Sequence, residues 1–541
     1  MNDDEQLPAD LRDSLLRAIK INSERAAADL ATEIDPASSI NYDEVRARTM
    51  ADLYRERVII EEKFRQHRPR EAAFWGIAPA TCQDVEQTLV NHPDVGVLQY
   101  FLCEERLLIF LTTADETRAT HTNISKQDLT RQIQRYRRLI EMQGKENLSV
   151  LNSSQTASVL LDEISLQLYQ ALIAPIEAFL PQGIRLCIIP HSVLHYLPLN
   201  ALRTERGNYL MEEIEILYAV SSSIFDWCYN QNVDRANTRI VTFANPTIGD
   251  GGWDLPLAGE LWASLAETAD VRLFSGSEAN KQAFWQHAPE AAILALDVHN
   301  VFNKNYPLST ALRLAPVRDN NGAITVREIY LAGKGAFRGR LAVAAVCDGN
   351  LGEDTGTAAE DELTTLARAL HYAGFPTVIT SLWRVHDLSA WFLMEFLYGE
   401  LLKADNEAGW LPAGEALRKA QMHVARLSGG QALERCLNQR RRVLKEDSQD
   451  IRAAWLEISA IAWIEVHCGN FPAAEQAYEC ARDAFESAGG DYKNIVAAID
   501  HDVPILRRLR EMHPQIPDYE RPIFAHPYYW APFILLGRWS C

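Results

Sequence analysis

Apolar side chains change their spacing several times along the chain. Residues 8–66 carry them at helical spacing, which predicts two long helices. Two short apolar runs, 96–102 and 106–112, are separated by a polar turn and predict a β-hairpin. Helical spacing returns over 126–142 and 158–179. The first third of the chain is therefore expected to be largely helical around one hairpin.

From residue 183 onward strand-like and helical segments alternate, which is typical of an α/β sheet. The expected strands are 185–189, 214–220, 239–244, 291–298, 341–346 and 377–382. The last three are apolar without alternation, so they are expected to be parallel strands buried on both faces. The expected helices are 258–267, 278–287, 361–373, 388–402 and 414–426.

Residues 427–520 interrupt this alternation with a charged, helical segment. Within it, Gly469, Ala474 and Ala481 have offsets like those of a tetratricopeptide helix pair, which must pack on a neighbour to bury its apolar face. The basic run 439–442 favours a solvated helix face, with an acidic partner surface as the alternative. The closing run 528–539 is strand-like and is expected to return to the sheet.

Composition narrows the class of protein. The 541 residues are 47% hydrophobic, enough for more than one domain, and their formal net charge is −20. This charge argues against a surface that seeks nucleic acid or an anionic membrane. The first ten residues do not resemble a signal peptide, and no apolar run reaches the ~18 residues of a membrane span. A soluble, cytoplasmic protein is expected.

Nine cysteines are scattered along the chain without a CxxC pair. An odd number of isolated cysteines fits neither a disulfide framework nor a zinc site. Most are expected to be small buried apolar residues.

Cys347 differs because it shares its position with His299. Each follows an apolar strand, so both would project from carboxyl strand ends, where ligands bind in α/β sheets. If the strands are neighbours about 4.8 Å apart, the imidazole could take the thiol proton. The alternative is a small core cysteine and a strand-end histidine with a local hydrogen bond.

Several ordered segments resemble a known family. They are 186–202, 294–300 around His299, 344–354 around Cys347, 373–387 and 529–533. Together they are similar to the CHAT domain, a relative of caspases and separases in the caspase-haemoglobinase clan of cysteine peptidases. The resemblance runs from about residue 80 to the C-terminus, except for 427–520. It implies an α/β fold with a caspase-like, mostly parallel sheet flanked by helices, to which the residue patterns add the N-terminal helical region and the tetratricopeptide-like insertion.

The residue patterns and the resemblance together predict five parts. They are an N-terminal helical region (1–79), a hairpin with helices that opens the CHAT region (80–182), a caspase-like catalytic core (183–426), a helical insertion (427–520) and a C-terminal strand that returns to the core (521–541).

The resemblance also implies catalytic roles. Cys347 would be the nucleophile and His299 the general base and acid, with the oxyanion held by backbone N–H groups of Cys347 and Asn300. Asn300 stands where the family usually has glycine, and Asp348-Gly349-Asn350 departs from the usual nucleophile motif. No cofactor and no metal are expected.

Two acidic residues are expected to bind substrate. In the resembling peptidases an acid near the position of Asp387 lines the pocket for a basic P1 side chain, and Asp348 lies next to the nucleophile. The competing role for Asp387 is the N-cap of the helix that begins at Leu388.

The implied function is a cysteine endopeptidase that cleaves a protein substrate. Family members are often regulated effectors of bacterial defence or cell death, so an activating or regulatory protein partner is also expected. The rival hypothesis is a catalytically inert scaffold whose helices bind partners. The sequence leaves the substrate and the oligomeric state open.

Overall fold

The structure is a computed structural model. It describes residues 80–144, 154–248, 255–267, 269–301, 307–318, 320–333, 335–345, 362–403, 411–446, 451–488, 492–512 and 516–539. The predicted N-terminal helical region, 1–79, lies outside the described residues.

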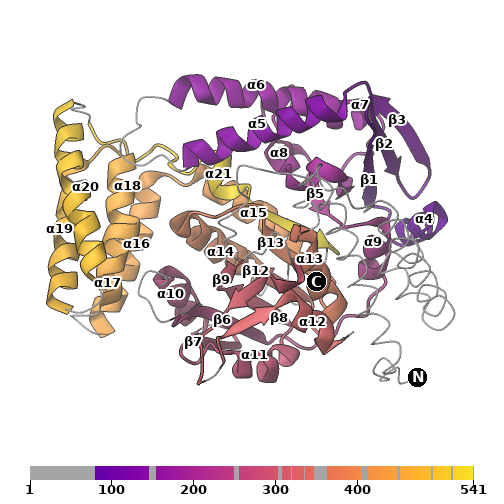
Figure 1. Ribbon diagram of the computed structural model, residues 1–541. Helices are drawn as coiled ribbons and strands as arrows, with labels where there is room; N and C mark the ends of the chain where they lie inside the picture. Colours follow the sequence, from indigo (N-terminus) through magenta and orange to yellow (C-terminus); the bar gives the residue numbers. More distant parts are fainter. Residues whose placement is uncertain are drawn as a thin grey trace, which may run out of the picture.

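An eleven-stranded sheet organises the described part of the chain (Figure 1). Its order is β3-β2-β1-β4-β5-β14-β13-β12-β8-β6-β7. The strands are β1 (Val95–Leu102), β2 (Leu107–Thr112), β3 (Thr117–Thr122), β4 (Arg185–Ile189), β5 (Glu215–Tyr218), β6 (Ile240–Pro246), β7 (Val271–Gly276), β8 (Ile293–Asp297), β12 (Leu341–Ala344), β13 (Thr377–Ser381) and β14 (Phe533–Gly537).

The C-terminal strand joins two blocks that run in opposite directions. β14 is antiparallel to β13 on one side and parallel to β5 on the other. Within the second block β13, β12, β8, β6 and β7 are all parallel neighbours. The predicted return of the C-terminus to the sheet is confirmed, although the run begins with a helical turn, α21 (Pro527–Trp530), before the strand.

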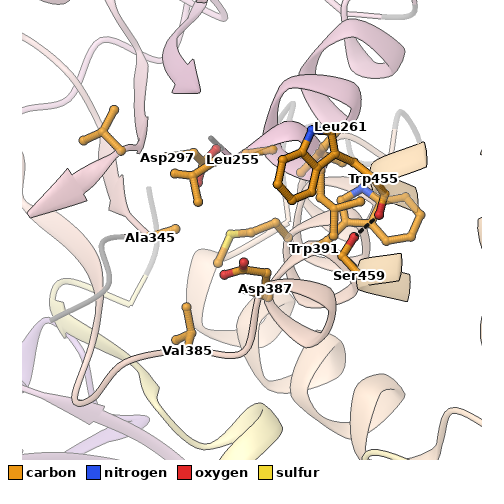
Figure 2. A pocket seen from close by; sticks show the side chains of 14 residues that line it. Leu255, Leu261, Asp297, Ala345, Val385, Asp387, Trp391, Trp455 and Ser459 are labelled. Carbon is orange, nitrogen blue, oxygen red and sulfur yellow. Dashed lines mark hydrogen bonds between the residues drawn. The ribbon is translucent and has the colours of Figure 1, made fainter. Parts of the chain in front are cut away.

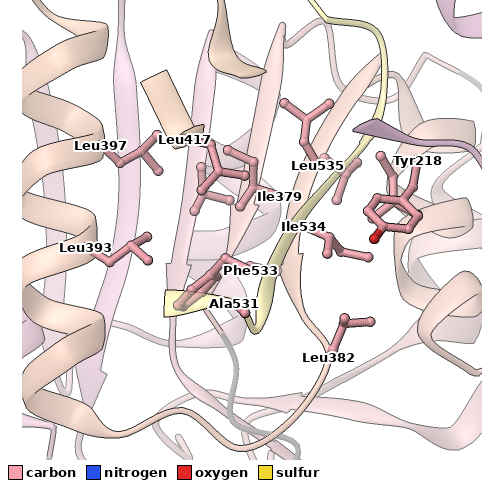
Figure 3. Close-up of a cluster of buried hydrophobic side chains, with 14 of the residues drawn as sticks. Tyr218, Ile379, Leu382, Leu393, Leu397, Leu417, Ala531, Phe533, Ile534 and Leu535 are labelled. Atoms are coloured by element: carbon pink, nitrogen blue, oxygen red, sulfur yellow. The ribbon is translucent and has the colours of Figure 1, made fainter. Parts of the chain in front are cut away.

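The central strands are buried as their apolar runs predict. Every residue of β8, β12, β13 and β14 is buried. Figure 3 shows Leu393, Leu417 and Phe533 packed around Ile379 of β13. Because strands covered on both faces need no polar side, these segments lack the alternation of a half-exposed strand.

Two rows of helices flank the sheet. One row contains α10 (Pro256–Leu265), α14 (Asp387–Leu401) and α15 (Ala413–Arg426), with α14 packed against both neighbours. The other contains α9 (Ser222–Tyr229), α13 (Glu362–Ala373) and α12 (Val326–Ala332), with α11 (Lys281–His287) nearby. The fold class predicted from the sequence is confirmed.

The N-terminal described part adds the sheet's outer strands and a helical hairpin. Its helices are α4 (Cys82–Val90), α5 (Lys126–Gly144), α6 (Ser154–Leu172), α7 (Ala174–Glu177) and α8 (Leu210–Glu213). β1 and β2 pair as the predicted hairpin. Short 3₁₀ turns are η1 (Ser192–Tyr196), η2 (Leu199–Ala201), η4 (Ala288–Glu290) and η5 (Pro307–Ser309).

Several short strands were not predicted. β3 forms the sheet edge from six polar or small residues, and β7 forms the opposite edge. A separate three-stranded sheet consists of β9 (His299–Val301), β10 (Ala311–Arg313) and β11 (Ala323–Thr325). Strands this short, or without an apolar face, give little pattern to recognise.

The described residues of the segment 427–520 form helices joined by short turns, with a non-helical stretch at 516–520. It contains α16 (Gly429–Glu446), α17 (Ile451–Leu456), a π-helical turn η6 (Glu457–Ile461), α18 (Ala462–His467), α19 (Phe471–Ala488) and α20 (Lys493–Met512). Gly469 joins α18 to α19 with a φ of 82°, and Ala474 and Ala481 are fully buried. This helical insertion forms a bundle beside the sheet (Figure 1).

The basic run of the insertion contacts acidic residues of the same chain. Gln439 donates to Glu260 of α10 over 2.7 Å, and Arg442 pairs with Glu267 just beyond that helix. Arg440 pairs with Glu457 inside the insertion. The acidic surface considered as an alternative from the sequence therefore exists, in part, within this chain. None of the described helices is both long and apolar enough to cross a bilayer.

Candidate active site

The two motif strands are parallel neighbours, as predicted. β8 and β12 pair in register from Leu341 with Ile293 to Ala344 with Leu296. Their carboxyl ends therefore meet at one edge of the sheet, about 4.8 Å apart. We call this the carboxyl edge, defined by the ends of β8, β12 and β13.

His299 lies at this edge, half-buried, as the first residue of β9. β9 pairs with β10, so that His299 lies opposite Arg313 and Asn300 opposite Leu312. Asn300 is in an extended strand, so asparagine in place of the family's glycine requires no left-handed backbone here. Its side-chain oxygen is buried and has no hydrogen-bond partner in the described part of the chain.

The other two predicted site residues on the nucleophile segment, Cys347 and Asp348, lie outside the described residues. The described segment that contains β12 ends at Ala345, one residue beyond the strand, and the next described segment begins at residue 362.

A pocket opens beside the ends of these strands (Figure 2). Its empty volume is about 750 Å3, including space open to solvent. Apolar side chains dominate its wall, and Asp297 and Asp387 are the two carboxylates that line it. The lining residues are Leu255, Leu257, Ala258, Leu261, Asp297, Val298, Ala345, Val385, Asp387, Ala390, Trp391, Met394, Trp455 and Ser459.

Asp387 is not the N-cap of α14. His386 has that position, and its ring nitrogen accepts the backbone N–H of Ser389 at 3.5 Å. The N-cap role considered for Asp387 is therefore wrong, because the cap is one residue earlier. The carboxylate of Asp387 lines the pocket instead. Asp387 is exposed, yet desolvation by the surrounding protein raises the pKa of its carboxylate, while electrostatic interaction with Arg384 and His299 opposes this rise. Asp387 and His299 thus interact electrostatically.

Asp297 is a second pocket carboxylate, which the sequence reasoning missed. It ends β8, is 5% exposed, and accepts a hydrogen bond from the indole N–H of Trp262. Burial raises its pKa to about 6, although the Trp262 bond lowers it. The available signal was a charged residue at the end of an otherwise apolar strand, two positions before His299.

Another cysteine and histidine are in contact elsewhere. The Cys228 sulfur lies 3.6 Å from Nδ1 of His371, close enough for a thiol–imidazole hydrogen bond of the kind a catalytic dyad needs. Both residues are fully buried. Sequence reasoning treated Cys228 as a small apolar residue and overlooked the contact.

The chemistry of this second pair opposes catalysis. Nδ1 of His371 also lies 2.7 Å from the carbonyl oxygen of Phe375, which can only accept, so Nδ1 carries the proton and cannot take one from the thiol. Burial lowers the pKa of His371 to about 4 and raises that of the Cys228 thiol well above its usual range. The pair packs against Gly537, which faces Thr377 at the amino end of β13, so it lies at the edge opposite His299.

Comparison with known proteins agrees with the motifs. The CHAT domain matches residues 162–538, more than two thirds of the chain. No curated protein matches. Two similar solved structures are of the Saccharomyces cerevisiae separase–securin complex at 3.0 and 2.6 Å resolution, with 11% and 10% identity and TM-scores of 0.42 and 0.41. Each match covers 71% of this chain and 33% of the other, so the chain spans about a third of that protein's length. With most of its length matched by the domain, the chain belongs to the CHAT domain family.

Proposed function

We propose that this protein is a cysteine endopeptidase in which Cys347 is the nucleophile and His299 the general base and acid. The observation that carries the proposal is the parallel pairing of β8 with β12, because His299 follows β8 at the carboxyl edge. Cys347 comes two residues after Ala345, a length of chain that spans at most about 7 Å. This supports a thiol within reach of the same edge.

The proposed reaction uses two side chains, two backbone N–H groups and water. His299 takes the thiol proton, the sulfur of Cys347 attacks the peptide carbonyl carbon, and backbone N–H groups of Cys347 and Asn300 hold the resulting oxyanion. When the carbon–nitrogen bond breaks, His299 returns the proton to the leaving amine. Water then hydrolyses the thioester with His299 acting as base, which restores the free thiol.

The proposed substrate is a protein with a basic P1 residue. Asp387 supports this choice because its carboxylate lines an apolar pocket that raises its pKa. A cationic side chain in the pocket would stabilise the ionised carboxylate and lower this pKa. Asp348 is proposed as a second acidic contact. A regulated role in bacterial defence or cell death, with an activating protein partner, rests on the family resemblance. Securin is the partner of separase in the Saccharomyces cerevisiae complex.

A covalent probe tests the nucleophile directly. A peptide acyloxymethyl ketone with arginine at P1 reacts with an activated thiol, and mass spectrometry of the digested protein identifies the labelled cysteine. We expect label on Cys347, loss of label in Cys347→Ala and in His299→Ala, and retained label in Cys228→Ala and His371→Gln.

The opposite pattern would overturn the assignment. Label that persists in Cys347→Ala but disappears in Cys228→Ala would make the buried pair the dyad. Absence of any label in the wild type, when the same probe labels an active caspase-like peptidase, would favour the inert scaffold.

A further inference from the structure

The helical insertion supplies part of the wall of the pocket at the carboxyl edge. Trp455 of α17 and Ser459 of the π-turn η6 line it, opposite residues contributed by the sheet and by α10 and α14. Figure 2 shows Trp455 and Trp391 on one side of the pocket, with Asp387 and Asp297 closer to Ala345. π-helical turns are rare and occur often at functional sites.

Polar contacts, two of them to one buried carboxylate, hold this wall in place. Glu260 of α10 is 6% exposed and is bound from the insertion by both Arg452 and Gln439. Arg435 of the insertion pairs with Glu395 of α14 over 2.8 Å. Because α10 and α14 themselves line the pocket, these contacts join three of its walls into one unit.

The insertion also supports the residue beside Asp387. The ring of Trp463 in α18 lies 4.8 Å from that of His386, the N-cap of α14. Asp387 follows directly as the first residue of that helix. The insertion therefore lines the pocket with the indole of Trp455, and Trp463 contacts His386, the residue before the pocket carboxylate Asp387.

The combination of groups favours one kind of cation. Carboxylates at Asp387 and Asp297 attract any positive charge, but two indoles in the same wall distinguish a planar guanidinium from a compact, strongly hydrated ammonium. The guanidinium can stack on an indole while it donates to a carboxylate, whereas an ammonium must shed more water to enter an apolar pocket.

We propose that Trp455 is a specificity-determining residue delivered by the helical insertion, and that through it the pocket selects arginine over lysine at P1. The proposal rests on the proposed function for the name P1, but the binding preference itself requires no catalysis. The insertion thus acts as part of the substrate pocket.

Small cations test the preference without chemistry. Binding of n-butylguanidine and n-pentylamine to the full chain is measured by calorimetry, since these reproduce the arginine and lysine side chains with one charge each. We expect n-butylguanidine to bind about threefold to thirtyfold more tightly, the range of one cation–π contact. In Trp455→Ala this ratio should fall to about one. Equal binding of both cations by the wild type, or an unchanged ratio in Trp455→Ala, would overturn the proposal.

Two controls separate specificity from folding. Phe485 packs edge-on against Trp455, 5.2 Å between ring centroids, but does not line the pocket, so Phe485→Ala disturbs the same small core and should keep the ratio. Ser459→Phe should fill the pocket and abolish binding of n-butylguanidine. Its match is Ser487→Phe on the exposed side of α19, since both serine hydroxyls donate to the carbonyl four residues earlier. Binding retained by Ser459→Phe would place the cation elsewhere.

The outcomes distinguish the two proposals. If binding of n-butylguanidine is preferred and depends on Trp455, but the covalent probe does not label Cys347, the role of Trp455 stands and Cys347 is not the nucleophile. Label on Cys347 with no cation preference would do the reverse.

Discussion

The two ends of the central strands differ in how they surround a cysteine or a histidine. One is the carboxyl edge. The other, which we call the amino edge, is defined by the amino end of β13 and contains Cys228 and His371. At the amino end of β13, Cys228 and His371 are in contact, yet both are fully buried. At the carboxyl edge, His299 is half-buried beside a pocket that carries two carboxylates. The Cys228–His371 pair has contact without access to solvent, whereas His299 has partial access to solvent and lies beside an open pocket.

Contact alone does not activate a thiol. A nucleophilic cysteine needs a populated thiolate, a base whose free nitrogen can take the proton, and a route for substrate. The buried pair lacks all three, because burial raises the pKa of Cys228, Nδ1 of His371 already donates to Phe375, and no solvent reaches either side chain. A search for close cysteine–histidine pairs alone would therefore choose a pair that meets none of these three requirements.

The largest expected effect is on catalysis at the carboxyl edge. Cys347→Ala and His299→Ala should each lower kcat at least about 10³-fold, and the double variant should be little worse, because nucleophile and base act in one coupled step. Cys228→Ala should keep kcat/KM within about twofold. Kinetics of a P1-arginine peptide under activating conditions checks this, with melting temperatures as the test of folding.

Either of two results would break the comparison. Wild-type kcat in Cys347→Ala would mean that the nucleophile lies elsewhere. A large loss of kcat in Cys228→Ala, without a loss of stability, would mean that the sealed edge opens during turnover.

The next effect is on stability at the amino edge. Gly537 has a φ of +93°, and a Cβ there would lie 2.2 Å from the Pro376 carbonyl oxygen and 2.7 Å from Cε1 of His371. Gly537→Ala should therefore destabilise the fold by more than about 3 kcal/mol, from clash added to backbone strain.

A matched glycine isolates the packing part of this effect. Gly183 also has a positive φ, +76°, but an added Cβ would meet nothing within 4 Å. Gly183→Ala should lose only the left-handed strain of about 1 to 2 kcal/mol. Equal losses in the two variants, measured by urea unfolding, would show that the amino edge is not tightly packed.

Sequence patterns predicted the strands that carry the site because those strands are buried. The apolar runs that end near Val298 and Ala345 could only be central strands, and their adjacency followed from motifs expected at one edge. β3 and the small sheet of β9 were missed, since their residues are polar or their strands only three residues long.

The composition of the pocket was harder to foresee than the sheet. Trp455 and Ser459 lie more than 150 residues after Asp297, and no local pattern indicates that the insertion folds back onto this wall. The cap of α14 was misassigned by one residue because aspartate is the commoner N-cap, whereas here the ring nitrogen of His386 accepts the backbone N–H. Long-range packing and single-residue choices of this kind need coordinates.

The smallest expected effect concerns the cost of keeping a charge at the carboxyl edge. Asp297 is buried with a pKa of about 6, raised from 3.8 by burial, with the Trp262 indole and the electrostatically coupled Tyr398 beside it. The folded state binds the proton of Asp297 more tightly than the unfolded state does, so the stability that Asp297 contributes below about pH 4 is lost as the pH rises through about 6.

Asp297→Asn, whose amide oxygen can still accept the Trp262 hydrogen bond, should therefore be more stable than wild type by about 1 to 3 kcal/mol at pH 7 and show little gain at pH 4. The same Asp297→Asn variant should bind n-butylguanidine less tightly, because it lacks the ionised carboxylate that attracts the cation. An ionised carboxylate that lowers stability is expected where it serves binding.

Denaturant unfolding at both pH values, paired with calorimetry at pH 7, measures the two effects in one variant. A variant that is less stable at pH 7 and binds the cation unchanged would show that Asp297 serves the packing of β8 and that the two edges differ less than their geometry indicates.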